Sequence, residues 1–560
     1  MNRGALDVVM GLMLVLLSGC GGAEPSADFL ETTPGEVAGL PALPSHGTTA
    51  RSPRGMVVTG SPHATEAGRR MLAVGGNAVD AAVAAAFALA VAEPTQSGLG
   101  GRTQLLLREA DGRVHAVDGT TQVPAGFVAA TDPDAVAEVG LPAVAIPGTV
   151  AALTRVLEEH GSLSLATVLE PARTWAAEGL ELTPAEATRL ADVVEEAGPD
   201  SEVARTFGGV GPGRRLVQPD LAGVLEMLAR DGRAAFYEGA IAQAMVADME
   251  ARGGVVSAQD LSAYRAEDGR VGRGRFQGHQ VVGSYLPASG VTVVEILQIL
   301  DRLELPDDAT EPGRWAATLA GALTVGFQDR EQAELLPAQE AVAWLTSDSL
   351  AERRAQEIAG RLSSSVVASS GRSVAPTRPE PPFTTHVSVA DAEGMVVALT
   401  QSLGPTGGAQ VVTPGLGFLY ASTLGGYLAG GAPGYRPWSS QAPLLVLDGS
   451  GPRLVVGGAG ARRILSAEVA TLVRVLAGGR SVAEALSAPR LHPTGGEVRV
   501  AEGWAAGERL TDLGYSVGTR EPGYFARLNV VERTPRGLWV GHADERWSGG
   551  GASGPEGSPR

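Results

Sequence analysis

The chain of 560 residues carries 44 arginines and lysines against 62 aspartates and glutamates, so its formal net charge is −18. A chain of this length buries a large core, and its acidic balance excludes the basic face that a nucleic-acid binder needs. All 44 cations are arginine, which excludes lysine Schiff-base chemistry and a Walker-type phosphate loop. The eight histidines are scattered, with no HExxH pattern, so we expect no metal site and no cofactor.

The N-terminal segment predicts export and a lipid anchor. Arg3 precedes an apolar run over residues 8–17 that is too short to span a bilayer, and Leu-Ser-Gly-Cys follows at 17–20. Cys20 is the only cysteine, which favours lipidation there over the alternative, a simple secretory signal. We therefore expect a lipoprotein signal peptide over residues 1–20. The mature protein would be attached to the cell envelope by its lipid anchor only. The glycines after Cys20 favour the periplasmic face of the outer membrane.

Two segments are too polar to belong to a core. Residues 21–54 are rich in Pro, Gly, Ser and Thr and are expected to form a flexible tether. Residues 547–560, WSGGGASGPEGSPR, are expected to form a disordered tail. Nothing between them marks a repeat or an independent extra domain.

Residues 148–260 are predicted to be mostly helical, and further helices are expected before and after that stretch, up to residue 362. Asn77 and Asp80 form a variant of the capping box at the start of an almost wholly apolar helix. The glycine-rich segment 97–107 lacks the spacing of a nucleotide loop, so it indicates tight backbone packing before a strand, with 114–119 as the partner strand. The glycines of 208–213 predict a surface loop. Apolar patterns indicate helices over residues 64–74, 78–92, 149–160, 165–178, 221–230, 290–303, 315–335 and 351–362.

A β-hairpin is predicted over residues 384–402, directly after a Ser- and Pro-rich run over 361–383. Alternating valines follow Thr384-Thr385-His386, residues 391–394 form a turn, and an apolar strand returns. Opposing residue numbers then sum to 785 or 786, which brings Ser402 beside Thr384.

The hairpin allows one specific chemistry. A threonine hydroxyl needs a base to act as a nucleophile. If the chain is cut immediately before Thr384, the freed α-amine of Thr384 can serve as that base. On these residues alone, the alternative is a linker that meets an ordinary strand, where threonine is favoured.

Beyond the hairpin, residues 410–420 and 443–457 are predicted strands. Further strands and one helix, 482–487, are expected between 454 and 540. The segment GGAGARRIL at 457–465 is a glycine-rich turn into a helix. Such a turn presents free N–H groups, as an oxyanion hole requires, although an ordinary strand-to-helix connection is the alternative.

The sequence TTHVSVADAEGMVVALTQS from Thr384 resembles the start of the small subunit of the gamma-glutamyltransferases, which are N-terminal-nucleophile hydrolases. Residues 55–101, 145–153, 216–246 and 436–447 also resemble that family, in its order, so the likeness covers roughly residues 55–505. The resemblance implies a four-layer αββα sandwich of the α+β class. It also implies self-cleavage between Phe383 and Thr384. The large-subunit-like region 55–383 and the small-subunit-like region 384–546 then stay associated.

The resemblance further implies a set of site residues. Thr384 corresponds to the nucleophile, and Ser402 stands where the family has a second threonine that supports it. Gly460 and Ala461 match the glycine pair that donates to the oxyanion. Ser439 and Ser440 match a serine pair of the substrate pocket.

Other pocket positions depart from the family. Thr120 stands where the family has the arginine that binds the substrate α-carboxylate, and Thr423 and Gly426 replace residues that hold the α-ammonium. Gly404 replaces a loop asparagine. Each lost charge-assisted hydrogen bond is worth roughly 1.5–3 kcal/mol. Arg102, Arg436, Arg462 or Arg463 could replace the missing cation of the pocket. Nothing in the sequence predicts that any of these side chains points into it.

Three hypotheses follow. The first is a gamma-glutamyl hydrolase or transferase with rearranged recognition residues, acting on a small-molecule amide or peptide. The second is an amidase for a different acyl group, as in the cephalosporin-acylase branch of the fold. The third is a catalytically silent lipoprotein that keeps the fold for binding.

Overall fold

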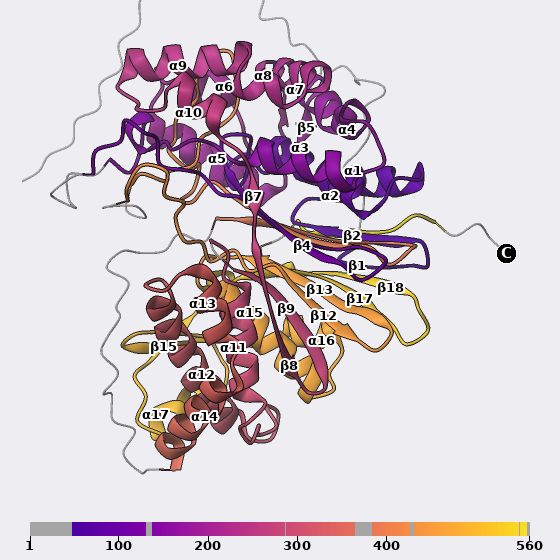
Figure 1. Cartoon of the computed structure of the whole chain (residues 1–560), viewed down its shortest axis with the longest axis vertical. Coiled ribbons are helices and arrows are strands. Elements are labelled where there is room, and N and C mark those ends of the chain that lie inside the picture. The colour runs from indigo at the N-terminus through magenta and orange to yellow at the C-terminus, as the bar shows by residue number, and fades with distance from the viewer. Residues whose placement is uncertain are drawn as a thin grey trace, which may run out of the picture. The chain divides into compact units, whose positions relative to one another are not determined.

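Two seven-stranded antiparallel sheets lie face to face in the computed structural model, and helices cover the outer side of each (Figure 1). The predicted four-layer αββα sandwich of the α+β class is confirmed. The structure describes residues 47–129, 137–285, 287–363, 383–425, 431–547 and 549–556. The expected signal peptide and its Cys20 lie outside these described residues.

Each of the two sheets is named after one of its central strands. The β10 sheet has the order β19-β2-β10-β11-β3-β4-β7, and the β13 sheet has the order β1-β18-β17-β13-β12-β9-β8. The strands of the β10 sheet are β19 (Gly551–Ser553), β2 (Gly55–Thr59), β10 (Thr385–Asp391), β11 (Val396–Ser402), β3 (Arg102–Arg108), β4 (Val114–Gly119) and β7 (Glu267–Asp268). Those of the β13 sheet are β1 (Thr49–Ser52), β18 (Trp539–Ala543), β17 (Arg527–Arg533), β13 (Gly451–Ala459), β12 (Leu444–Asp448), β9 (His279–Tyr285) and β8 (Arg270–Phe276).

The helices form two groups, one on each sheet (Figure 1). On the β10 sheet lie α1 (Pro62–Ala73), α2 (Ala78–Ala92), α3 (Thr149–His160), α4 (Leu165–Glu178), α5 (Pro184–Ala197), α6 (Glu202–Phe207), α7 (Pro219–Asp231), α8 (Arg233–Tyr237), α9 (Ala240–Arg252) and α10 (Ala258–Ala263). On the β13 sheet lie α11 (Gly290–Leu300), α12 (Pro312–Ala333), α13 (Ala338–Leu345), α14 (Asp348–Ser363), α15 (Arg463–Leu472), α16 (Val482–Ser487) and α17 (Ala506–Asp512). Smaller sheets are formed by β14 (Leu491–Thr494), β15 (Glu497–Ala501) and β16 (Val517–Arg520), and by β5 (Leu180–Glu181) and β6 (Arg215–Leu216).

Helix α2 supports the central strands of the β10 sheet. The predicted capping box is present, since Asn77 accepts from the N–H of Asp80 while the Asp80 carboxylate accepts from the N–H of Asn77. Every residue of α2 is buried, and the helix packs on β10 and β11. Its all-apolar surface therefore fixes the back of the hairpin that carries the predicted nucleophile.

The layer between the sheets is apolar over most of its area and polar at one end. Leu106 on β3 and Ala398 on β11 are paired, and both lie in a buried cluster with Leu445 and Val455 of the β13 sheet. Four residues further along β11, the same face carries Ser402, because side chains alternate along a strand. The candidate site therefore lies at the end of the apolar layer.

The chain passes from one sheet to the other at Gly269, between β7 and β8 (Figure 1). The Gly269 N–H donates to the Ala116 carbonyl on β4 at 2.8 Å. A Cβ at position 269 would lie 2.9 Å from the Ala116 Cβ, so only glycine fits here without a shift.

Both predicted flexible ends differ from the structure. The tether was expected to reach residue 54, but Thr49–Ser52 form β1 and pair with β18. The tail was expected to be disordered from residue 547, but Gly551–Ser553 form β19 and pair with β2. Both strands complete a sheet edge by backbone hydrogen bonds, which the polar composition of these segments does not reveal.

Two further expectations are wrong. Residues 410–420 form no strand, only isolated bridges between Val412 and Leu419 and between Tyr420 and Gly100, because Gly415 and Gly417 adopt positive φ and turn the chain. Between 454 and 540 the structure has α17 besides the predicted helix at 482–487 and α15, the helix expected after the glycine-rich turn.

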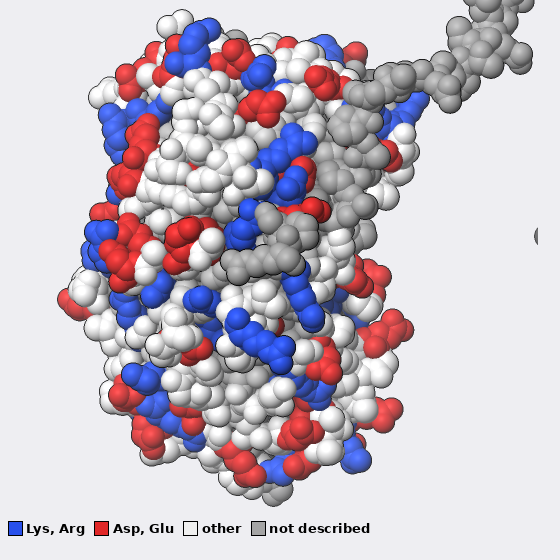
Figure 2. All heavy atoms as spheres, turned by 90° about the vertical axis from the view of Figure 1, so that its right-hand side faces the viewer, with Lys and Arg blue, Asp and Glu red and all other residues white. Residues whose placement is uncertain are grey.

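The described residues contain no helix with the length and apolar character needed to cross a bilayer. On the face shown in Figure 2, acidic and basic side chains lie interspersed. Many such charges are local arginine–carboxylate pairs, such as Arg69 with Glu66 at 2.6 Å.

Candidate active site

The β10–β11 hairpin has the predicted register. Thr385 is paired with Gln401, so opposing numbers sum to 786 and Thr384 lies beside Ser402. Thr384 is buried, and its Oγ1 donates to the Ser402 Oγ at 3.3 Å. The two hydroxyls that the hairpin register predicts to be adjacent are therefore in contact.

Ser402 also contacts the peptide bond that precedes Thr384. Its Oγ donates to the Phe383 carbonyl oxygen at 3.0 Å and accepts from the Gly404 N–H at 3.0 Å. Gly404 can supply this N–H because it adopts a φ of +89°, and a Cβ there would lie 3.1 Å from the Ser422 carbonyl oxygen. One serine hydroxyl thus joins the Thr384 hydroxyl to the carbonyl at the predicted cleavage point.

His386 ties the hairpin to the β13 sheet and carries no charge at neutral pH. Its ring nitrogens contact the Thr400 Oγ1 at 2.8 Å and the Ser388 Oγ at 3.0 Å. Burial, with a contribution from the charge of Arg527, lowers the pKa of His386 to about 3. A Cβ at Gly457 would collide with the imidazole, so glycine at that position of β13 makes room for the ring.

Contacts between the sheets locate the glycine-rich turn. The Ser388 Oγ lies 3.4 Å from the Val455 carbonyl oxygen, and His386 packs on Gly457, two residues further along β13. Another step of two residues brings the Thr384 end of β10 opposite the end of β13 at Ala459. The turn formed by Gly460 and Ala461 therefore lies at the Thr384 end of the hairpin.

This turn has an uncommon backbone conformation. Gly460 and Ala461 both have positive φ, +142° and +54°, which is unusual for alanine. The Arg463 Nε donates to the Gly460 carbonyl at 3.0 Å. Because the C=O and N–H of one peptide point in opposite directions, the Ala461 N–H points away from Arg463.

The predicted site residues on the β10 sheet form a row. Thr384 lies beside Ser402, Ser402 is paired with Arg102 on β3, and the register of β3 with β4 continues to Thr120. Directly opposed residues point to the same face of a sheet. Thr384, Ser402, Arg102 and Thr120 therefore lie side by side on the face toward the β13 sheet.

Thr120 is buried in a polar network rather than open to a ligand. Its Oγ1 accepts from the Gln104 Nε2 at 2.6 Å, and its N–H donates to Asp118 at 2.8 Å. Arg436 pairs with Asp118 at 2.9 Å. The Nε of Arg436 contacts Gln122 and its remaining terminal nitrogen donates to the Arg265 carbonyl. All three guanidinium nitrogens of Arg436 therefore already have protein partners.

The segment that carries Thr423 lies against the ends of β3 and β11. The Ala421 N–H donates to the Gly100 carbonyl, and the Ser422 N–H donates to the Leu403 carbonyl. Thr423 itself is buried. Gly426, the other predicted departure in this segment, lies outside the described residues.

The serine pair lies at the side of β11. The Ser439 Oγ donates to the Gln441 Oε1 at 3.0 Å, and the Gln441 Nε2 donates to the Thr400 carbonyl at 2.7 Å. Ser440 accepts from Arg330 at 3.4 Å, and Arg330 was not identified from the sequence. No nearby motif marks Arg330, since it reaches this loop from α12.

Two features lie outside this row. Glu109, His115 and His160 bring candidate ligand atoms within 4.8 Å of one another, which the scattered positions of histidine in the sequence did not indicate. Glu109 also pairs with Arg113 at 2.5 Å, so the group is an ion-pair network between the β3–β4 hairpin and α3. The predicted absence of a metal site stays a prediction.

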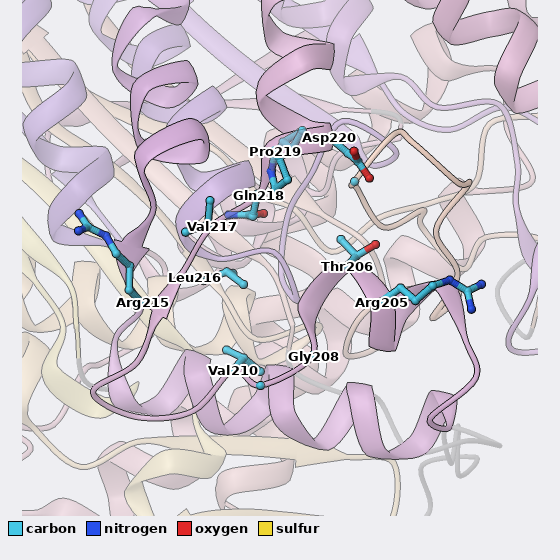
Figure 3. Close-up of a pocket in the computed structure, with 13 residues that line it drawn as sticks. Arg205, Thr206, Gly208, Val210, Arg215, Leu216, Val217, Gln218, Pro219 and Asp220 are labelled. Carbon is cyan, nitrogen blue, oxygen red and sulfur yellow. The ribbon is translucent and has the colours of Figure 1, made fainter. Parts of the chain in front are cut away.

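A cavity of about 430 Å³ lies between the loop after α6 and the start of α7 (Figure 3). The predicted surface loop at 208–213 forms part of its wall. In Figure 3 the guanidinium groups of Arg205 and Arg215 point away from each other. None of the predicted site residues lines this cavity.

Comparisons with known proteins identify the family. The gamma-glutamyltranspeptidase family model matches residues 64–554. The acylase ACY 1 proenzyme of Pseudomonas sp. (strain V22) is 33% identical over 531 residues, covering 89% of this chain and 93% of that protein. The glutathione hydrolase proenzyme of Escherichia coli (strain K12) is 32% identical over 492 residues, covering 81% and 84%. The crystal structure of cephalosporin acylase from Bacillus halodurans matches with a TM-score of 0.80 at 25% identity, over 93% of this chain and 99% of that chain.

The family match spans the hairpin, the glycine-rich turn and both sheets, and it extends over most of the chain. Its relatives include acylase and glutathione hydrolase proenzymes. The chain therefore belongs to the gamma-glutamyltranspeptidase family of N-terminal-nucleophile hydrolases.

Proposed function

We propose that the protein is a self-processing acylase in which Thr384 cleaves an amide whose acyl group is not gamma-glutamyl. The observation that carries this proposal is the buried network at Thr120, which holds a neutral hydroxyl where a gamma-glutamyl pocket needs a cation. The similarity to acylases over 89–93% of both chains supports the same hypothesis.

Self-cleavage would begin at the three contacts around Ser402. The Thr384 Oγ1 attacks the Phe383 carbonyl carbon and gives its proton to the Ser402 Oγ, which passes its own proton to the carbonyl oxygen. When the C–N bond breaks, the proton returns to the departing nitrogen, leaving an ester and a free Thr384 amine. Water then hydrolyses the ester and releases the Phe383 carboxylate.

The processed enzyme would use the same threonine on its substrate. The Thr384 amine takes the proton of the Thr384 hydroxyl, which attacks the amide carbonyl. The N–H groups of Gly460 and Ala461 stabilise the oxyanion, a contribution worth about 2.7–4 kcal/mol for one donor where it has been measured. The amine product leaves with a proton, and water cleaves the acyl-threonine ester.

The two fragments would stay together because their strands interleave. β10 pairs with β2, β11 with β3, and β12 with β9, so each sheet contains strands from both sides of the cut. Separating the fragments would break both sheets.

A gamma-glutamyl hydrolase is the second candidate. The similarity to the Escherichia coli glutathione hydrolase proenzyme and the retained pair Ser439 and Ser440 favour it. A silent binding protein is the weaker alternative, because the contacts among Thr384, Ser402 and Phe383 have no role in it.

The experiment follows the chain and its activity together. Purified protein should separate into two fragments on denaturing electrophoresis, and the smaller should begin at Thr384. Thr384→Ala should remain one chain and hydrolyse no acyl anilide. A wild-type chain that stays intact after prolonged incubation would remove the basis of the proposal.

We also propose that lipid on Cys20 holds the enzyme in the cell envelope, which the single cysteine after a short apolar run supports. Cys20→Ala should move the protein from the membrane fraction to the soluble fraction. Unchanged membrane association would refute the anchor while leaving the acylase proposal intact.

A further inference from the structure

We propose that Glu109, His115 and His160 form a binding site for a zinc ion, at the end of the β3–β4 hairpin that lies away from the predicted nucleophile. The ion would join this hairpin to the last turn of α3. The proposal departs from the sequence-based expectation of no metal site. That expectation relied on the spread of the histidines along the chain, which strand pairing and helix packing overcome.

Three separate elements bring the ligands together. His115 on β4 is paired with Leu107 on β3, and Glu109 follows Leu107 by two residues. Because side chains alternate along a strand, Glu109 and His115 leave the hairpin on the face of Leu107. Leu107 shares a buried apolar cluster with Val156 of α3. Helix α3 lies over β4 on this face, and His160, one turn after Val156, is its last residue (Figure 1).

The three ligand atoms lie near the spacing that zinc requires. The Glu109 Oε1 lies 2.8 Å from the His160 Nδ1 and 3.4 Å from the His115 Nε2. All three atoms lie within 4.8 Å of one another. Zinc bonds of about 2.0–2.1 Å in tetrahedral geometry place neighbouring ligand atoms about 3.3 Å apart. Small rotations of the two imidazoles therefore bring all three atoms onto one ion.

One of these ligand atoms is buried without a hydrogen bond. The His115 Nε2 has no hydrogen-bond partner among the described residues, although it lies within ion-pair distance of Glu109. A buried polar atom without a partner is costly, and a zinc ion would satisfy it. The side chain of His115 is 36% exposed as a whole, so water can reach the ion and complete its coordination.

Neighbouring charges orient the ligands without occupying the atoms that zinc would use. Arg113 bonds the other carboxylate oxygen of Glu109, Oε2, at 2.5 Å. The Glu159 Oε2 lies 3.8 Å from the His160 Nε2, the ring nitrogen that does not contact Glu109. Partners of this kind hold metal-binding side chains in the required orientation. The ion-pair network around Glu109 is therefore compatible with a metal site and supports it.

The backbone that carries the ligands is held in place. The Glu109 N–H donates to the Arg113 carbonyl at 2.9 Å, and the Gly112 N–H donates to the Glu109 carbonyl at 3.0 Å, which closes the hairpin loop. The His160 carbonyl accepts from the Asn77 side chain at 2.7 Å. Because α3 ends at His160, its dipole also favours a cation at this position.

The ligand atoms select the class of ion. Two imidazole nitrogens and one carboxylate oxygen suit zinc, whereas Mg²⁺ and Ca²⁺ prefer oxygen ligands. Zinc imposes no geometry through its d electrons, so it tolerates unevenly spaced ligands. Glu109 lies about 23 Å from Arg102, at the rise of a strand, which separates the ion from the chemistry at Thr384. The zinc site is thus structural, and it does not depend on the proposed function.

The test measures zinc binding by the full chain, without an affinity tag and after a chelator has removed metals. Titration calorimetry with zinc chloride should give one site per chain. Glu109→Gln and His160→Gln should each raise the Kd by at least about tenfold. Zinc should also raise the Tm of the wild type but not that of either variant, since an ion that binds only the folded chain stabilises it. Circular dichroism without zinc checks that both variants are folded.

His279→Gln is the matched control, because His279 is a partly buried histidine on β9, outside the proposed site. It should change the Kd by less than about threefold. Wild-type binding no tighter than that of Glu109→Gln would overturn the proposal, and so would equal weakening by His279→Gln. A Tm that rises as much with calcium chloride as with zinc chloride would contradict the imidazole ligands.

Discussion

The Ser402 Oγ lies 3.0 Å from the carbonyl oxygen of Phe383, the residue on the other side of the predicted cleavage point. The same hydroxyl accepts from Thr384, so it touches both the attacking and the attacked group. A serine hydroxyl has one donor and two acceptor positions. Ser402 uses its donor on Phe383 and accepts from Thr384 and the Gly404 N–H.

Ser402→Ala should therefore slow self-cleavage by about 10²- to 10³-fold, the cost of removing one oxyanion donor. The time course of fragment formation on denaturing gels measures the rate. Ser402→Thr should process at close to the wild-type rate because it keeps the hydroxyl. If Ser402→Ala cleaves as fast as wild type, the relay through Ser402 is wrong.

The second prediction concerns pH and stability. The pKa of His386 is lowered to about 3 by burial, with a contribution from Arg527, and the pKa of His492 is likewise lowered to about 3 by burial, with contributions from nearby arginines. Between about pH 6.5 and 3 the unfolded chain binds a proton at each histidine that the folded chain does not. The free energy of unfolding should therefore fall as the pH falls, by up to about 1.4 kcal/mol per pH unit for each histidine.

Urea unfolding of the wild type and of His386→Asn between pH 4 and 6.5 isolates this contribution. Burial raises the pKa values of Glu295 and Glu468, so their contribution to the free energy of unfolding rises as the pH falls. Both proteins contain these glutamates, so this contribution cancels when the two pH dependences are subtracted. The wild type should show the steeper slope. His492→Asn repeats the comparison on β14, and parallel slopes for all three proteins would contradict the neutral-histidine assignment.

The third prediction concerns the exchange of charge between neighbouring strands. Thr120→Arg alone would bury a second cation beside Arg102, close to the Asp118–Arg436 pair, and should destabilise the fold. Combining it with Arg102→Thr should recover stability, with a favourable coupling of about 1 kcal/mol or more. The free energies of unfolding of the wild type, the two single variants and the double variant form a double-mutant cycle that measures this coupling. Additive effects would mean that the two side chains do not share one space.

Local patterns predicted the parts of the fold that local physics decides. The Asn77–Asp80 cap, helices α3 and α4, and the hairpin register all follow from neighbours within a few residues or one turn. Long-range pairing was not visible in the same way. β1 and β19 are strands only because a sheet edge is available to them.

The site shows the same division. The contact of Thr384 with Ser402 follows from one hairpin, and it was predicted. The place of Arg102 depends on the pairing of β3 with β11, which joins positions 300 residues apart. The sequence therefore identified this arginine as a candidate but did not predict where its side chain lies. Gly457 was not linked to His386, because that contact joins two different sheets.

The most direct test of the acylase proposal compares kcat/KM of the processed enzyme on glutaryl and gamma-glutamyl p-nitroanilides, which differ only by the α-amino group. With Thr120 and Thr423 in the pocket, the glutaryl compound should be hydrolysed at least as efficiently as the gamma-glutamyl one. A gamma-glutamyl preference above about tenfold, equivalent to about 1.4 kcal/mol, would contradict the proposal and show that other residues rebuild the ammonium site.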